Sequence, residues 1–471
     1  MHGHSIIEGQ PTSAGGDTFT ATNPATGDAL PTTFVYATAD DVDRACMSAA
    51  DVFAAFQRAE RAPFLRAIAD KIEALGDELL ERFTAETALP RGRAEGECAR
   101  TCGQLRNFAD QIERDDWNSP IKQGNLSRRY VGIGPVAVFG PANFPLAYGV
   151  AGGDTASALA AGCPVIVKTH PSHPGVCELV AGAIVDAAAE TGMPAGVFAL
   201  LVGGVEVGER IVKHADVRGV GFTGSENGGR AIFDAAAARP TPIPAFAEMS
   251  SLNPIVVLPG HYTDEFVDGL VGSVTLGVGQ FCTKPGLIFV PSGTDLSGLK
   301  DKLAAVGSQT MLNASMRKSY VEGTAKLASV PGTEALLMPE DDAGSGGANA
   351  TPALLRVAAT HFGQSKVLHR EVFGPGTLVV EYDDLADVRI ASAHLGGQLT
   401  ASVHGEPDDD LLHLLTTLAG RVIFGGYPTG VEVTAAMVHG GPYPATTDAR
   451  FTAVGDRAID RWLRPVCLQG A

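Results

Sequence analysis

Cys282 and Glu248 are the residues of this sequence whose types and settings best suit chemistry. The cysteine lies in Gly279-Gln-Phe-Cys-Thr283, and the glutamate lies upstream in Phe246-Ala-Glu-Met-Ser-Ser251. A thiolate can attack a carbonyl carbon, and a carboxylate can then activate the water that releases the product. The pair therefore predicts covalent thiol chemistry on a carbonyl substrate. The alternative is a buried structural thiol and an unrelated surface carboxylate.

The composition limits the size class and the partners of the chain. With 471 residues, 45% of them hydrophobic, it is long enough for two substantial cores. A net charge of −18 argues against general nucleic-acid binding, but it is compatible with a local basic pocket for one phosphorylated cofactor. No apolar run is long enough to span a bilayer, and the first residues lack the basic and apolar regions of a signal peptide. We expect a cytoplasmic protein.

The seven cysteines are scattered and odd in number, which favours reduced thiols over a disulfide framework. Cys98 and Cys102 are four residues apart on an expected helix and could share a metal ion. Because no nearby His or Cys completes such a site, we interpret them as helix-packing thiols and predict no metal site.

The expected secondary structure changes near residue 135. Before it, apolar positions at helical spacing predict helices around 41–56, 63–79 and 98–112. After it, helical stretches alternate with short apolar runs at 136–139, 165–167, 197–202, 217–222, 254–258, 287–290, 377–380, 400–403 and 422–424. Unbroken apolar strands between helices indicate parallel sheets covered on both faces. We predict an α/β fold with two domains divided near residue 250.

Three of the expected strands end in residues suited to ligand binding, and ligands gather beyond the C-terminal ends of parallel strands. These residues are Asn143 in a Pro-bracketed turn, Lys168, and the Gly-rich turn at 223–229 with Ser225, Gly224 and Gly229. An amide can hydrogen-bond an oxyanion, an ammonium group can bind ribose or phosphate, and bare N–H groups at a helix start can hold a pyrophosphate. Each has a structural alternative, but together they predict a dinucleotide site.

With these residues in order, the sequence resembles the aldehyde dehydrogenase superfamily over nearly its whole length. The matching motifs are Pro141-Ala-Asn-Phe-Pro145, Lys168, Phe222-Thr-Gly-Ser225, Glu248, Cys282 and Glu371-Val-Phe-Gly-Pro375. A closer likeness, to the 2,5-dioxopentanoate (α-ketoglutarate semialdehyde) dehydrogenase branch, lies in 248–254, 279–286 and the tail segments 428–433, 437–447 and 463–467. Long-chain fatty aldehyde dehydrogenases are near relatives of that branch.

The resemblance implies oxidation of an aldehyde to a carboxylate with NAD(P). Cys282 is then the nucleophile, Asn143 and the Cys282 N–H bind the oxyanion, and Glu248 activates water. Lys168 and Glu371 hold the two riboses and Phe373 packs on the nicotinamide, while Ser225, Gly224 and Gly229 form the pyrophosphate turn.

The cofactor prediction depends on the third residue after Lys168. NAD-preferring relatives often have glutamate there, which repels a 2′-phosphate, whereas this sequence has Pro171. Arg210 could pair with the extra phosphate, or it could be a solvated helix residue. We predict a preference for NADP, with NAD also used.

The implied substrate is 2,5-dioxopentanoate, whose far carboxylate requires a cation. Arg100 and Arg106 are the candidates, although each could instead be a surface or ion-pairing residue. The predicted tunnel residues are Gln104, Tyr148, Phe281 and Thr283. If neither arginine points inward, a medium- or long-chain fatty aldehyde is the better substrate.

The resemblance also implies the domain limits and an oligomer. The dinucleotide-binding domain is expected at 1–113 and 134–250, the catalytic domain at 251–454, and an element bridging subunits at 114–133 and 455–471. A homodimer or homotetramer follows. The competing hypotheses are a CoA-acylating enzyme, which would commonly lack the glutamate, and a catalytically silent dinucleotide-binding or structural protein.

Overall fold

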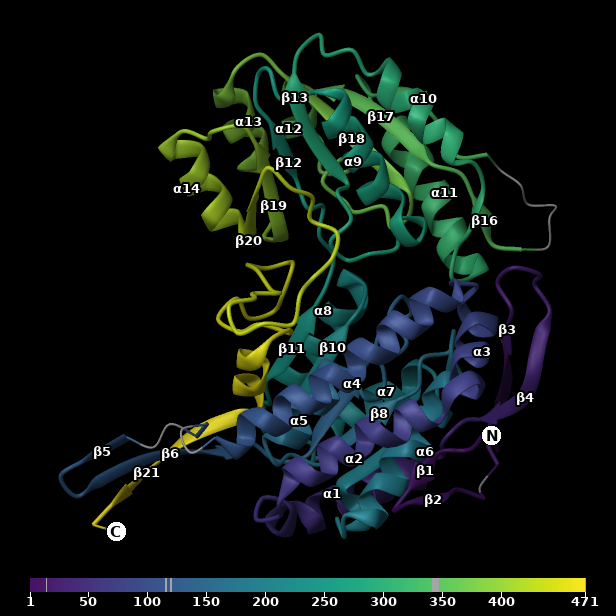
Figure 1. Ribbon diagram of the computed structural model, residues 1–471, viewed down its shortest axis with the longest axis vertical. Coiled ribbons are helices and arrows are strands. Elements are labelled where there is room, and N and C mark those ends of the chain that lie inside the picture. The colour runs from purple at the N-terminus through teal and green to yellow at the C-terminus, as the bar shows by residue number, and fades with distance from the viewer. Residues whose placement is uncertain (14, 115–116, 119–120, 341–346, 471) are drawn as a thin grey trace.

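The protein is described here by a computed structural model that covers residues 1–13, 15–114, 117–118, 121–340 and 347–470 (Figure 1). Two α/β units lie one above the other in this view, and a slender β arm projects from the lower one. The α-helices are α1 Ala39–Phe56, α2 Arg61–Ala74, α3 Gly76–Thr87, α4 Arg91–Glu113, α5 Gly153–Ala160, α6 Pro174–Glu190, α7 Val205–Lys213, α8 Glu226–Ala237, α9 Asp264–Thr275, α10 Ser297–Val306, α11 Ala314–Ala328, α12 Ala359–Gln364, α13 Leu385–Ser392 and α14 Asp409–Leu418.

The first unit is built on a sheet of order β11-β10-β7-β8-β9-β1-β2. Its strands are β1 Ile6–Ile7, β2 Gln10–Pro11, β7 Val136–Phe139, β8 Val165–Lys168, β9 Phe198–Leu201, β10 Gly219–Thr223 and β11 Ala245–Glu248. The strands from β11 to β9 are parallel, whereas β1 and β2 are antiparallel additions. Alternate side chains pack against α2, α5 and α6 on one face and against α1, α7 and α8 on the other. The expected burial on both faces is confirmed.

The second unit repeats this architecture in the order β15-β17-β18-β13-β12-β19-β20. Its strands are β12 Ile255–Val257, β13 Leu287–Pro291, β15 Glu334–Leu337, β17 Ala353–Ala358, β18 Gly376–Tyr382, β19 Gln398–His404 and β20 Ala419–Phe424. All neighbours are parallel except β15. Helices α12 to α14 pack on one face, and α9 and α10 pack on the other. The predicted α/β class is confirmed.

The arm is a third, antiparallel sheet of order β21-β6-β5, with β5 Ile121–Gln123, β6 Leu126–Gly132 and β21 Leu463–Gln469. It stands away from the body of the molecule (Figure 1). Two small sheets pair β3 Thr18–Thr22 with β4 Ala29–Val35 and β14 Gln309–Thr310 with β16 Asn349–Ala350. The three larger sheets are our basis for proposing the domain limits given above.

Two parts of the structure differ from the sequence-based expectation. The helix expected at 63–79 is two helices, because Gly76 adopts φ +52° and α3 starts anew there. Strand β11, which ends at Glu248, was not predicted, since the short run Ala245-Phe-Ala247 lacks an aliphatic signal.

A long segment without α-helix or strand connects β20 to β21 and passes between the two units (Figure 1). It includes one 3₁₀ helix, Asp456–Trp462. Within the described ranges, no helix is long and apolar enough to cross a membrane.

Candidate active site

The backbone before Cys282 is held in an uncommon conformation. Gly277, Val278 and Gly279 have φ values of +56°, +59° and +63° in succession. This conformation is unfavourable for a β-branched residue such as Val278 and marks stored strain next to a reactive group. A Cβ on Gly279 would lie 2.3 Å from the Gly374 carbonyl oxygen. The close packing of these two loops therefore requires glycine.

Asn253 fixes the other side of the cysteine loop. Its Nδ2 donates to the carbonyl oxygens of Cys282 at 2.8 Å and Lys284 at 2.9 Å. The residue is fully buried and adopts φ +50°, which asparagine tolerates better than most residues. Cys282 is thus held by packing on one side and by hydrogen bonds on the other.

Glu248 and Cys282 meet at a third residue, His439. The Nε2 atom of His439 lies 2.8 Å from Glu248 Oε1 and 3.5 Å from Cys282 Sγ. Both Glu248 and His439 are buried, at 3% and 1% exposure. If Nε2 carries the proton, the same N–H can donate to the carboxylate and to a thiolate. The sequence analysis missed His439, because it lies in the irregular segment after β20, where no periodicity links it to Cys282.

Burial and nearby charge disfavour ionisation of the resting thiol. Burial raises the pKa of Cys282 well above its ordinary value, and the negative charges of Glu248 and Glu371 raise it further. A base beside the thiol would therefore assist its attack on a carbonyl. Among the described residues, Glu248 Oε2 is buried and has no hydrogen-bond partner, which leaves an acceptor free beside the thiol.

Asn143 follows β7 and reaches the same loop. Its Nδ2 donates to the Gln280 carbonyl oxygen at 2.9 Å, and the residue is 8% exposed. A primary amide has two N–H groups, so one remains for an oxyanion at Cys282. The structure brings Cys282, Glu248 and Asn143 together as predicted.

Comparisons with known proteins identify the family of the chain. Residues 12–443 match the model of the aldehyde dehydrogenase family. The chain is 46% identical to alpha-ketoglutaric semialdehyde dehydrogenase 2 of Azospirillum brasilense, across 100% of this chain and 94% of the relative. It is 42% identical to alpha-ketoglutaric semialdehyde dehydrogenase of Acinetobacter baylyi, across 99% and 94%.

The chain belongs to the aldehyde dehydrogenase family.

The predicted resemblance to the α-ketoglutarate semialdehyde branch of that family is also confirmed. Solved structures of the family share the fold at lower identity. Aldehyde dehydrogenase C from Pseudomonas syringae superposes with a TM-score of 0.86 at 22% identity, covering 99% of this chain and 96% of that chain.

The predicted pyrophosphate turn connects the end of β10 to the N-terminus of α8. Ser225 caps α8 by accepting a hydrogen bond from the Gly228 N–H, and the Gly224 N–H donates to the Glu248 carbonyl oxygen. A Cβ on Gly229 would lie 2.6 Å from Met249 Cγ, so α8 can approach β11 only with glycine there. The turn expected to bind the pyrophosphate is therefore hydrogen-bonded directly to Glu248, the residue beside the thiol.

Lys168 lies at the end of β8, where its Nζ donates to the Thr169 carbonyl oxygen at 2.7 Å. Burial lowers its pKa to about 8. Lys168 forms no ion pair with any of the described residues. Its ammonium group therefore has N–H donors available for an anion or a hydroxyl group. Gly208 of α7 packs over it, and a Cβ there would lie 3.4 Å from Lys168 Cδ.

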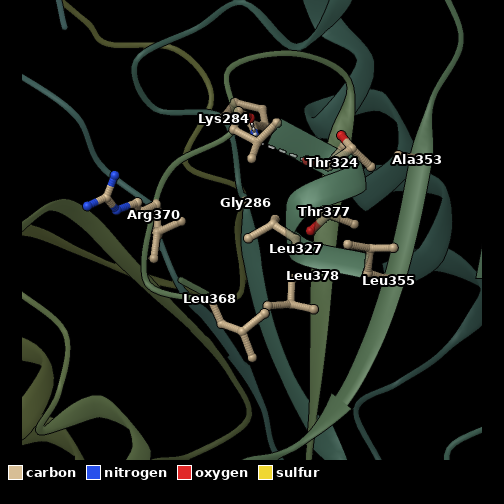
Figure 2. A pocket seen from close by; sticks show the side chains of 13 residues that line it. Lys284, Gly286, Thr324, Leu327, Ala353, Leu355, Leu368, Arg370, Thr377 and Leu378 are labelled. Carbon is tan, nitrogen blue, oxygen red and sulfur yellow. Dashed lines mark hydrogen bonds between the residues drawn. The ribbon is translucent and has the colours of Figure 1, made fainter. Parts of the chain in front are cut away.

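The loop with Glu371 and Phe373 is tied to the cysteine loop through Lys284. Lys284 Nζ donates to the carbonyl oxygens of Gly376 at 2.8 Å and Val372 at 3.2 Å. Figure 2 shows this lysine at the edge of a pocket whose apolar wall includes Leu327 and Leu378. Burial raises the pKa of Glu371 to about 7, and Lys284 opposes that shift. The hydrogen bonds of Lys284 therefore connect the two loops directly.

Two of the predicted arginines form ion pairs with acidic side chains in this structure. Arg210 donates to both carboxylate oxygens of Asp43 on α1, at 2.6 and 2.9 Å, so its guanidinium is not left available for a 2′-phosphate. Arg106 pairs with Asp70 and Glu73 of α2, because it lies on the face of α4 that packs on that helix. It is not grouped with the other substrate residues.

Two of the remaining predicted substrate residues, Tyr148 and Phe281, form an aromatic wall near the thiol. Tyr148 lies 6.2 Å, ring to ring, from His439, and both Tyr148 and Phe281 pack edge-on against Phe144. Within the described ranges, the buried polar atoms Thr283 Oγ1 and Gln104 Nε2 have no hydrogen-bond partner. Arg100 lies over Tyr148, with its Cζ 5.8 Å from the ring centroid.

Sequence analysis also missed Arg93, on the same face of α4. Its guanidinium lies 4.4 Å from the Phe144 centroid and 4.6 Å from that of Phe281, and it pairs with Glu97. It stiffens the aromatic wall as a cation between two rings. Arg93 could have been predicted from its spacing to Arg100, because residues seven positions apart lie two turns apart on the same face of a helix.

Proposed function

We propose that this chain oxidises 2,5-dioxopentanoate to 2-oxoglutarate with NAD(P). The observation that carries the chemistry is the meeting of Cys282, Glu248 and His439 at hydrogen-bond distances beside Asn143. The substrate is supported by the two relatives that are 46% and 42% identical over essentially the whole chain. The arginine beside Tyr148 supplies the cation that a keto acid requires.

In the proposed reaction, Glu248 takes the thiol proton and the Cys282 sulfur bonds to the aldehyde carbon. The resulting oxyanion accepts hydrogen bonds from Asn143 Nδ2 and the Cys282 N–H, and loss of one such donor typically costs about 3–4 kcal/mol of barrier. Nicotinamide, when bound, supplies the acceptor for the hydride. After Glu248 has released the thiol proton to solvent, the thioester left on Cys282 is hydrolysed by a water whose proton passes to Glu248. His439 holds Glu248 for both proton transfers.

The described residues fit a nicotinamide dinucleotide. Lys168 and Glu371 would hold the riboses, the N–H groups of the Ser225–Gly229 turn the pyrophosphate, and Phe373 the nicotinamide. We propose that NADP is preferred and NAD accepted, because Pro171 places no carboxylate where a 2′-phosphate would lie. Arg210 is paired with Asp43. We therefore base the proposed preference on the lack of a carboxylate that would repel the 2′-phosphate, and not on a cation that binds it.

The arm is the proposed contact between subunits. Its outer strands β5 and β21 each have an unpaired edge within the described residues, and such edges pair readily with another sheet. We propose a homodimer or homotetramer built through this sheet.

A panel of aldehydes assayed with NADP and NAD, with and without CoA, tests the function. The proposal predicts that 2,5-dioxopentanoate has the highest kcat/KM and that CoA is not required. A preference for octanal would favour the fatty aldehyde alternative, which the aromatic wall around Tyr148 also suits. Absence of turnover with every aldehyde would indicate a catalytically silent protein.

A further inference from the structure

Two arginines from different α/β units meet on one short segment beside the candidate active site. Arg100 of α4 donates through Nη1 to the Val431 carbonyl oxygen. Arg421 of β20 donates through Nη1 to the Gly430 carbonyl oxygen at 2.9 Å and through Nη2 to that of Pro428 at 2.6 Å. The two guanidinium groups therefore lie on adjacent peptide carbonyls.

Neither group has an anionic partner within the described ranges. Other arginines of α4 do have one: Arg93 pairs with Glu97, and Arg106 with Asp70 and Glu73. The Nε atoms of both Arg100 and Arg421 are buried and unpartnered. Partly buried cations that share neighbouring carbonyls repel each other, and carbonyl dipoles offset only part of that cost. Glu432 is a nearby negative charge that favours the charged form of Arg421, but it forms no ion pair with that arginine.

Side-chain contacts lead from these arginines to the thiol. Arg100 lies over the Tyr148 ring, which lies 6.2 Å from the His439 ring, and His439 Nε2 lies 3.5 Å from Cys282 Sγ. Arg421 comes from the other unit and binds the carbonyl next in sequence to the one that Arg100 binds. A five-carbon chain spans about 5 Å from its aldehyde carbon to its carboxylate carbon. The far carboxylate of an aldehyde bound at Cys282 would therefore be directed along Tyr148 toward this pair of arginines.

We propose that Arg421, together with Arg100, binds the far carboxylate of the substrate and sets the preference for charged aldehydes. This inference depends on the proposed function. The planar guanidinium offers two parallel N–H donors that match a carboxylate, and in the free enzyme the carbonyls of 428–431 keep both groups in place. The segment between β20 and His439 thereby connects substrate recognition to the catalytic histidine.

The test compares 2,5-dioxopentanoate with pentanal, an uncharged aldehyde of the same chain length. We expect Arg421→Gln to lower the ratio of the two kcat/KM values about 10- to 100-fold, mainly through the KM of the charged aldehyde, as loss of a charge-assisted hydrogen bond predicts. Arg421→Lys keeps the positive charge but loses the planar guanidinium, so its ratio of kcat/KM values should lie between those of the wild type and Arg421→Gln. Arg106→Gln, on the face of α4 that packs on α2, is the matched control and should leave the ratio unchanged.

A second measurement separates recognition from a merely structural role of Arg421 in holding 428–430. Glutarate, which carries two carboxylates but no aldehyde, should inhibit pentanal oxidation competitively, and Arg421→Gln should raise its inhibition constant about tenfold or more. Equal losses with both aldehydes and an unchanged inhibition constant would overturn the proposal. If the wild-type enzyme does not prefer 2,5-dioxopentanoate, the proposed function fails. If that preference exists and survives in Arg421→Gln, only this inference fails.

Discussion

Replacement of His439 by asparagine tests the most unexpected feature of the site. The histidine Nε2 atom lies 2.8 Å from Glu248 Oε1 and 3.5 Å from Cys282 Sγ, whereas a shorter amide would reach neither. Glu248 is 3% exposed, so water cannot readily replace the lost donor. A hydrogen bond to a charged group contributes about 1.5–3 kcal/mol. At about 1.4 kcal/mol per tenfold, kcat should fall roughly 10- to 150-fold.

The assay is pre-steady-state formation of the reduced cofactor. If His439 mainly holds Glu248 for hydrolysis, His439→Asn should show a burst of about one equivalent per site followed by a slow steady rate. Alkylation of Cys282 by iodoacetamide should also slow, because the thiolate loses an N–H donor. His439→Gln, which can place an amide N–H near the Nε2 position, should recover part of the rate. A kcat for His439→Asn within about twofold of wild type, with unchanged alkylation, would refute the role.

Three further predictions follow from the same geometry. Because the pKa of Cys282 is raised by burial and by Glu248, its thiol form persists to higher pH; iodoacetamide should react more slowly than with a free thiol at pH 7, and the rate should still rise above pH 9. A plateau below pH 8 would contradict this. The ligand atoms of Glu248, Cys282 and His439 lie within 4.8 Å of one another, and Cys282 Sγ lies 3.5 Å from His439 Nε2. A sulfur and a nitrogen ligand of tetrahedral zinc are separated by roughly 3.6 Å, so Zn²⁺ should bind these residues and inhibit the enzyme reversibly. Inhibition that a chelator does not reverse, or that His439→Asn does not weaken, would count against that site. Gly279→Ala should lower the free energy of unfolding by at least about 1–3 kcal/mol in urea titration, because of its φ of +63° and the 2.3 Å approach to Gly374; equal stability would show that the loops can separate.

The sequence was most informative where chemistry coincides with regular structure. Asn143 and Lys168 follow strands with unbroken apolar runs, so their placement at one sheet edge could be predicted from periodicity alone. Cys282 and Glu248 were found from residue type and motif. The α/β architecture followed from the same alternation of strands and helices.

The residues that were misplaced or missed depend on long-range contacts. Arg100 and Arg106 lie on one helix six residues apart, so they point to different faces, and no local pattern says which face meets the substrate. The sequence around Arg210 gives no sign of its ion pair with Asp43, because the two residues lie far apart in the chain and meet only in the folded protein. His439 is separated from Cys282 by more than a hundred residues, and only the path of the segment after β20 brings it to the thiol; that segment also carries the carbonyls that Arg421 binds.

The most direct test of the central claim is peptide mass spectrometry of the Glu248→Gln variant after incubation with 2,5-dioxopentanoate and NADP. Because Glu248→Gln slows the deprotonation of the thiol but also removes the base for hydrolysis, the acyl group should form slowly and then accumulate on the peptide that contains Cys282, and only when the cofactor is present. An acyl group on another cysteine, or none on Cys282 while turnover continues, would contradict the account.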